Sequence, residues 1–295
     1  MSILLNALTR IVFYGADTPH GARQRKALCE SGALLVASVG QEGPSGPGSK
    51  AVYTTAREAV SSSGIIDLAV IFSPPARVLE DTKDALAANI RSILITTEYV
   101  PVHDALELKA LSHAAGAVLV GPNSSGILTP GEARAGFICN SICIPGRVGV
   151  VAKSGSVTFA AMSEMKFAGL GVSTVASIGG DLVKGTDYRR LLDLFERDPE
   201  TDCVLILGEV GGADEELAAA HIAKHIGKPV VAFVSGRLVK PGQNIGHAGA
   251  IVTQGRGGYE GKVRAFKEAG VSVAEQFSDI VPMLLRCPAP RTARR

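Results

Sequence analysis

The sequence predicts an α/β protein made of two domains, and three observations support this. Short apolar runs bounded by glycine alternate with longer amphipathic stretches, which is typical of βαβ units and a parallel sheet. The 295 residues are enough for two domains, each with its own core. A glycine- and proline-rich passage, Gly121 to Gly146, interrupts the alternation. We therefore predict a first domain at residues 1–125, a connector at 126–146 and a second domain at 147–295.

In the first domain, each predicted strand is a short apolar run, and each predicted helix is an amphipathic stretch. The predicted strands are Ile11–Tyr14, Leu34–Ser38, Leu68–Phe72, Ser92–Thr97 and Val118–Val120. The predicted helices lie around Ala22–Ser31, Thr55–Ser62, Ala76–Ala88 and Val102–Ala115. The segment Glu42–Lys50 is dense in glycine, serine and proline, which predicts an exposed loop.

The same alternation resumes in the second domain. The predicted strands are Val148–Ala152, Val172–Ile178, Cys203–Gly208, Val230–Val234 and Val271–Ala274. The predicted helices lie around Val157–Ala168, Tyr188–Arg197, Ala213–Ile226, Tyr259–Ala269 and Phe277–Leu285. We expect the basic tail Arg291–Arg295 to be frayed.

Composition argues against several classes of function. The net charge of +2 predicts no nucleic-acid partner, and the chain has no apolar segment of about 18 residues that could span a membrane. The first residues lack the features of a targeting peptide, and the five cysteines are scattered, so we expect a cytoplasmic protein. Cys139 and Cys143 have no further ligands nearby in the sequence, so no metal site is predicted.

His247 is the first candidate functional residue. It is flanked by small residues in Gly246–Ala250, on a loop that follows the apolar run Pro229–Val234. Loops that leave the carboxyl ends of parallel strands are where α/β proteins bind ligands. An accessible imidazole there is a candidate covalent nucleophile or proton carrier. The alternative is a loop histidine that only satisfies a nearby carbonyl group.

Two further sites in the second domain accompany this histidine. Glu209 ends an apolar run and precedes two glycines, so its carboxylate could accept the N–H of an imidazole and fix its tautomer. Ser154, Gly155 and Ser156 lie at a strand-to-helix turn, where the unpaired N–H groups of the first helical turn form an anion site. A helix cap with no ligand is the alternative interpretation of that turn.

These residues resemble the α-subunits of succinyl-CoA synthetase and related acid–CoA ligases over essentially the whole chain. The matching stretches are Met1–Leu4, Pro101–Asp104, Gly121–Asn123, Leu128–Glu132, Ile178–Asp181, Gly208–Gly212 and Gly246–Ile251. The resemblance implies a Rossmann-like CoA-binding domain followed by a flavodoxin-like ligase domain. It also implies that His247 is phosphorylated, that Glu209 supports it and that Ser154–Ser156 hold phosphate.

The resemblance implies partners as well. The chain has no Walker-type phosphate loop, so ATP or GTP with magnesium would come from a β-subunit with an ATP-grasp fold, in a heterodimer or heterotetramer. The substrate would be a small carboxylic acid. CoA would bind the first domain at Gly15 and Gly21 and at Thr97 and Glu98.

The chain departs from the family pattern mainly around CoA. Thr18 stands where the family's phosphate loop has its middle glycine, Pro19 lacks an N–H that would bind phosphate, and the pair is a good helix start. Gly43 stands where the family has a lysine, with Glu42 beside it. The resemblance thus implies a weakened CoA site. In the ligase domain, Phe159 replaces a tyrosine and Lys153 an arginine, so the acid specificity could differ.

Three hypotheses follow from this pattern. The chain is the α-subunit of a nucleotide-dependent acid–CoA ligase that works through phosphohistidine, with an altered acid specificity. Alternatively, it passes an acyl phosphate to a nucleophile other than CoA, or it is a non-catalytic regulatory paralogue that binds a β-subunit. We favour the first hypothesis because His247, Glu209 and the helix start at Ser154 occur together.

Overall fold

The chain forms two compact units in a computed structural model that describes residues 2–40, 51–240, 246–247, 249–250, 252 and 257–287. The first unit comprises Leu4–Asn140 and Val183–Thr186. The second comprises residues 2–3, Ser141–Leu182 and the described residues from Asp187 onward. The predicted loop Glu42–Lys50 and tail Arg291–Arg295 lie outside the described residues.

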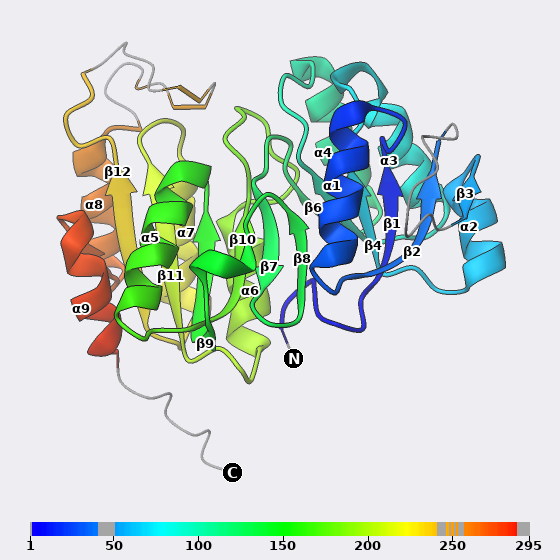
Figure 1. Cartoon of the computed structure of the whole chain (residues 1–295). Coiled ribbons are helices and arrows are strands. Elements are labelled where there is room, and N and C mark those ends of the chain that lie inside the picture. Colours follow the sequence, from blue (N-terminus) through cyan, green and yellow to red (C-terminus); the bar gives the residue numbers. More distant parts are fainter. Residues whose placement is uncertain are drawn as a thin grey trace. The chain divides into compact units, whose positions relative to one another are not determined.

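The first unit contains a parallel sheet with the strand order β3-β2-β1-β4-β5-β6 (Figure 1). Its strands are β1 (Arg10–Tyr14), β2 (Leu34–Val39), β3 (Val52–Tyr53), β4 (Leu68–Ile71), β5 (Ser92–Ile95) and β6 (Val118–Val120). This is the strand order of a dinucleotide-binding Rossmann fold. The sequence did not predict β3, since a two-residue strand at the edge of a sheet leaves no periodic pattern to detect.

Among the described residues of this unit, four α-helices connect the strands. They are α1 (Pro19–Glu30), α2 (Ala56–Ser63), α3 (Val78–Ala87) and α4 (Val102–Ala114). The helices α2, α3 and α4 pack small side chains, such as Ala59, Ala85 and Ala105, against the buried strand residues Val12 and Ile71. α1 begins three residues before the predicted start because Thr18 caps it and Pro19 occupies its first position.

The passage predicted as a connector, 126–146, contains an antiparallel hairpin. Its strands are β7 (Gly126–Thr129) and β8 (Ala133–Gly136), which pair Gly126 with Gly136. A Cβ on Gly126 would lie 2.2 Å from the carbonyl oxygen of Ala135. The glycines that suggested a connector therefore allow two backbones to approach closely, and the hairpin belongs to the first unit.

The second unit is built on five parallel strands in the order β13-β12-β11-β9-β10. These strands are β9 (Pro145–Ala152), β10 (Val172–Ser177), β11 (Cys203–Glu209), β12 (Val230–Ser235) and β13 (Ser272–Ala274). Numbered from β9 in chain order, this is the flavodoxin arrangement 2-1-3-4-5. Every residue of β10 and β11 is buried, as expected of central parallel strands covered on both faces.

The helices of the second unit cover both faces of this sheet (Figure 1). They are α5 (Gly155–Phe167), α6 (Tyr188–Arg197), α7 (Asp214–His225), α8 (Tyr259–Glu268) and α9 (Ile280–Leu285). α6, α7 and α8 pack side by side, while α5 contacts α9. The predicted last helix is shorter than expected, because Phe277–Asp279 form a 3₁₀ turn before α9 begins. None of the helices in the described ranges is long and apolar enough to span a membrane.

Each sheet has one point at which the connections change direction, and ligands of α/β proteins bind beyond the strand ends there. In the first unit this point lies between β1 and β4. In the second unit it lies between β9 and β11. Glu209 is the last residue of β11, and Ser154 follows β9 by two residues. The strand order thus brings two of the candidate residues to the same edge of the second sheet.

Candidate functional site

His247 and Glu209 form a close pair in the second unit. The Nδ1 atom of His247 lies 2.9 Å from Oε1 and 3.0 Å from Oε2 of Glu209, although 38 residues separate them in the chain. The side chain of Glu209 is 5% exposed and that of His247 is 28% exposed. A carboxylate on Nδ1 favours the tautomer in which Nδ1 carries the proton and Nε2 carries the lone pair.

Gly180, in the loop after β10, provides the surface against which the imidazole packs. A Cβ on Gly180 would lie 2.6 Å from Cδ2 and 2.9 Å from Nδ1 of His247, so only glycine leaves room for the ring. The backbone N–H of Gly249 donates to the carbonyl of Gly180, and that of Ala250 donates to the carbonyl of His247. The hydrogen bond between Gly249 and Gly180 therefore joins the turn at His247 to the loop after β10. This contact and the packing on Gly180 restrict the orientation of the ring.

The predicted anion site is the N-terminus of α5. Ser154 is its N-cap, and the Ser154 hydroxyl accepts the N–H of Val157 at 3.5 Å. Ser154 and Gly155 are half-buried and Ser156 is exposed. Because β9 lies between β10 and β11, this helix begins between the loop of Gly180 and the strand end of Glu209. A phosphoryl group at this edge would meet the positive end of the α5 dipole.

A buried group of charges that the sequence did not predict lies next to Glu209. We call Lys153, Asp214, Glu215, Glu216 and Lys262 the buried ion cluster. The Lys153 ammonium lies 2.8 Å from Glu215 and 3.1 Å from Asp214. The Lys262 ammonium lies 2.5 Å from Glu215 and 2.9 Å from Glu216. Glu215 and Lys262 are fully buried.

The position of Lys153 bears on its expected role. From the family resemblance, Lys153 replaces an arginine and was expected to affect the acid specificity. In the structure its ammonium is inside the protein, paired with Glu215 and Asp214, and its side chain is 5% exposed. The clue in the sequence is a lysine in the apolar run Val148–Lys153, since a charge buried at a strand end needs a partner.

Because of the buried ion cluster, the protein should lose stability at high pH. Burial alone would lower the pKa of Lys153, but the carboxylates of Glu215 and Asp214 outweigh burial and raise the pKa from 10.5 to about 12. Because the pKa is higher in the folded state, this pairing stabilises the protein fully below pH 10.5. The stabilisation, about 2 kcal/mol, should be lost between pH 10.5 and 12.

Urea unfolding of the wild type and of Lys153→Met across pH 9 to 12 measures this effect. The free energy of unfolding of the wild type should fall more steeply with pH than that of the variant, by about 2 kcal/mol over the interval. Equal slopes for the two proteins would show that Lys153 does not titrate as the structure implies.

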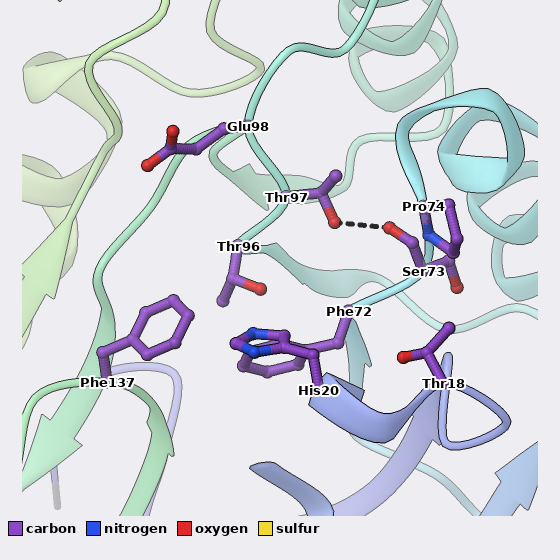
Figure 2. Close-up of a pocket in the computed structure, with 9 residues that line it drawn as sticks. All are labelled: Thr18, His20, Phe72, Ser73, Pro74, Thr96, Thr97, Glu98 and Phe137. Carbon is purple, nitrogen blue, oxygen red and sulfur yellow. Dashed lines mark hydrogen bonds between the residues drawn. The ribbon is translucent and has the colours of Figure 1, made fainter. Parts of the chain in front are cut away.

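A cavity of about 450 Å³ opens in the first unit, at the point between β1 and β4 where the connections change direction (Figure 2). It is lined by Thr18, His20, Phe72, Ser73, Pro74, Thr96, Thr97, Glu98 and Phe137. The rings of His20, Phe72 and Phe137 stand within 6 Å of one another and form its aromatic wall. The Thr97 hydroxyl donates to the Ser73 carbonyl at 2.7 Å.

The four predicted cofactor residues are distributed unevenly around this cavity. Thr97 and Glu98 line it, whereas Gly15 and Gly21 are not among its lining residues. A Cβ on Gly21 would lie 1.9 Å from the carbonyl oxygen of Gly15, so these glycines allow the turn to pack on the helix start. Phe72 and Phe137 were not predicted as site residues, because aromatic residues near a strand are usually part of the core.

The helix start beside the cavity offers little to a phosphate group. The N–H of Gly21 donates to the Thr18 hydroxyl at 3.0 Å, and Pro19 has no N–H. Asp17 adds a carboxylate, held by Arg77 through two hydrogen bonds of 2.6 and 2.8 Å. Arg77 holds the pKa of Asp17 below its usual range, so the carboxylate stays charged. The mixed polar and aromatic cavity therefore fits the uncharged parts of a cofactor such as CoA better than it fits phosphates.

Comparison with known proteins identifies the family. Residues 145–285 match the model of the succinyl-CoA ligase like flavodoxin domain. The α-subunit of an ADP-forming succinate–CoA ligase from Aquifex aeolicus is 38% identical over 95% of this chain and 92% of its own length. The chain belongs to the succinate–CoA ligase α-subunit family.

One relative is named for an acid other than succinate. The SauD subunit of an ADP-forming sulfoacetate–CoA ligase from Bilophila wadsworthia is 38% identical over 96% of this chain and 98% of its own length. Among solved structures, ATP citrate lyase from Methanothrix soehngenii, in complex with citrate and coenzyme A, superposes with a TM-score of 0.83 at 26% identity. The superposition covers 99% of this chain and 54% of the lyase, so the chain spans about half of that protein.

Proposed function

We propose that this chain is the phosphate-carrying α-subunit of a nucleotide-dependent acid–CoA ligase, with His247 as the residue that is phosphorylated. The observation that supports this most strongly is the contact of His247 Nδ1 with both carboxylate oxygens of Glu209, at 2.9 and 3.0 Å. This contact directs the lone pair to Nε2, the nitrogen that would attack phosphorus. A histidine used only for packing would not require a buried carboxylate partner.

The reaction proceeds by transfer of one phosphoryl group. Nε2 of His247 forms a bond to the terminal phosphorus of the nucleotide as the bond to the leaving diphosphate breaks. Glu209 stabilises the positive charge that the ring acquires, and the N-terminus of α5 faces the phosphoryl oxygens. A carboxylate substrate then takes the phosphoryl group from Nε2 and becomes an acyl phosphate. The CoA thiol displaces phosphate to give the thioester.

The nucleotide would come from a second chain. The succinate–CoA ligase relatives are named as α-subunits, and this sequence contains no phosphate loop of the Walker type. We propose a β-subunit with an ATP-grasp fold that supplies ATP or GTP and magnesium. The acid is a small carboxylate, and Phe159, half-buried in the first turns of α5, would make its pocket less polar than a tyrosine would.

Coexpression with an ATP-grasp β-subunit tests this proposal. The complex is incubated with ATP or GTP labelled on the terminal phosphate, and acid-stable and acid-labile protein phosphate are compared. Acid-labile label on this chain supports a phosphohistidine; absence of label with either nucleotide would contradict the proposal and favour a regulatory paralogue. A panel of acids, including succinate and sulfoacetate, then identifies the substrate.

A second candidate function is favoured by the helix start beside the cavity. Because Thr18 and Pro19 leave few N–H groups for phosphate, the acyl acceptor could be a nucleophile other than CoA, such as an amine. The same acid panel, run with and without CoA, separates the two candidates. If the phosphohistidine turns over when the acid is present and CoA is absent, an acyl acceptor other than CoA is favoured.

Thr18→Gly should strengthen CoA binding. Removal of the hydroxyl frees the N–H of Gly21 for a phosphate oxygen, and one such hydrogen bond corresponds to about three- to tenfold in affinity. Titration calorimetry with CoA measures this change. Thr55→Gly, which removes the corresponding cap of α2, serves as the control and should leave CoA binding unchanged. Equal effects of the two substitutions would place CoA elsewhere.

Gly180→Ala should slow phosphorylation of His247. The added methyl group would collide with the imidazole at 2.6 Å, and a displacement of about 1 Å at a reacting group can cost up to ~100-fold in rate. The rate of acid-labile labelling measures the effect. Gly261→Ala, where a Cβ meets no atom closer than 3.9 Å, is the control and should label at the wild-type rate.

A further inference from the structure

Glu215 occupies the centre of the buried ion cluster and contacts residues at four elements around the site. Its Oε1 lies 2.8 Å from the Lys153 ammonium, 3.3 Å from the Tyr188 hydroxyl and 3.3 Å from the backbone nitrogen of Glu209. Its Oε2 accepts from Lys262 at 2.5 Å. A single fully buried carboxylate on α7 therefore links the ends of β9 and β11 to the start of α6 and to α8.

The partners of Glu215 are themselves fixed. The Lys262 ammonium donates to Glu215, Glu216 and the carbonyl of Gly212, which satisfies its three N–H groups. The Lys153 ammonium lies between Glu215 and Asp214, above the ring of Tyr188. Such a cluster leaves its central carboxylate little freedom to move, because each contact restrains it from a different side.

Stability alone is a weak reason for such a cluster. Buried charges lose their hydration, and apolar residues of similar volume often stabilise a protein as well or better. The cluster does have a clear geometric consequence. Glu209, whose N–H donates to Glu215, carries the carboxylate that contacts His247. Lys153 directly precedes Ser154, the N-cap of α5.

We infer that Glu215 is a positioning residue for phosphoryl transfer, which holds Glu209 and the N-terminus of α5 in the arrangement that His247 requires. This inference rests on the proposed function of His247. Glu215 touches none of the reacting atoms, so it acts through Glu209 and through Lys153. A change at Glu215 should therefore lower the rate of phosphorylation without changing the KM for the nucleotide, which the partner chain binds.

A double-mutant cycle tests this role on the complete complex. Glu209→Gln alone should slow acid-labile labelling by roughly 100-fold, and Glu215→Gln alone by roughly tenfold. In the Glu209→Gln background, Glu215→Gln should add less than about twofold, because its effect passes largely through Glu209. A full tenfold effect in both backgrounds would overturn the inference.

Asp84→Asn is the matched control for loss of a carboxylate. Asp84 accepts from the Tyr14 hydroxyl at 2.9 Å and from the backbone N–H of Ala56 at 2.8 Å, which resembles the surroundings of Glu215, but it belongs to the first unit. Its effect on labelling should be small and additive with that of Glu209→Gln. If Glu215→Gln does not fold, Tyr188→Phe removes one hydrogen bond to Glu215, keeps both lysines and should show the same loss of additivity.

A second measurement separates this inference from the proposed function. Nitrogen NMR of histidine-labelled full chain reports the tautomer of His247, identified among the six histidines by its absence in His247→Ala. Glu215→Gln should reduce the share of the tautomer with the proton on Nδ1, while Asp84→Asn should not. If the wild type is never phosphorylated, the proposed function fails. An unchanged tautomer in Glu215→Gln would overturn the positioning role itself.

Discussion

Replacement of His247 by alanine should abolish acid-labile phosphorylation of this chain and reduce thioester formation by about 10⁴-fold or more. In the proposed mechanism the ring is the group of this chain that forms a covalent bond to phosphorus, and alanine offers no nucleophile. Thermal stability should change little, because the side chain is 28% exposed and sits in a surface turn. Labelling with nucleotide in the presence of the β-subunit measures the loss of phosphorylation, and an assay of thioester formation measures the loss of activity.

His221→Ala provides a matched control for this experiment. His221 lies on α7 of the same unit and also pairs with a carboxylate, with its Nε2 2.7 Å from Asp193. It lies within a helix, whereas His247 follows the carboxyl ends of the strands. His221→Ala should retain wild-type labelling. If labelling survives in His247→Ala and disappears in His221→Ala, the phosphorylated residue has been assigned wrongly.

Lys262→Ala should have the largest effect on folding. The substitution leaves Glu215 buried with only one cationic partner and also removes the partner of Glu216. Removal of one member of a buried ion pair typically costs about 3–5 kcal/mol, which for a unit of this size lowers the melting temperature by roughly 10 °C. Thermal unfolding followed by circular dichroism measures this shift.

Lys267→Ala is the control, since it removes a lysine from the same helix, α8. Its partner is Glu275 at 2.9 Å, and both side chains are more than half exposed. Ion pairs at the surface contribute little, so the melting temperature should not change measurably. Similar decreases in melting temperature for the two variants would mean that the buried ion pairs of Lys262 stabilise the protein no more than a surface ion pair does.

Most elements of the fold could be predicted from local sequence. The strands of both units are short apolar runs, and the observed ends of the main strands lie within three residues of the predicted ones. The hairpin β7–β8 was missed because its glycines, such as Gly126, are also the usual mark of a loop. The sequence can show that a glycine is present, but the reason for it depends on the neighbouring strand.

Part of the candidate site could also be predicted from local sequence. His247, Glu209 and Ser154 each follow an apolar run, and in a parallel sheet all such ends lie at one edge. The buried ion cluster could not be predicted from local sequence. Lys262 and Glu215 lie in amphipathic helices, where charged residues usually face solvent. Nothing in their local pattern distinguishes them from the exposed Lys267.

The sequence by itself determined the fold class, the alternation of strands and helices and the set of residues able to carry chemistry. These depend on interactions between near neighbours in the chain. The tertiary structure alone decided the order of the strands, the placement of Gly180 beneath the imidazole of His247 and the burial of Lys153, Glu215 and Lys262 around one another. These features depend on which distant segments meet. That outcome is set by the packing of whole elements, which no local periodicity encodes.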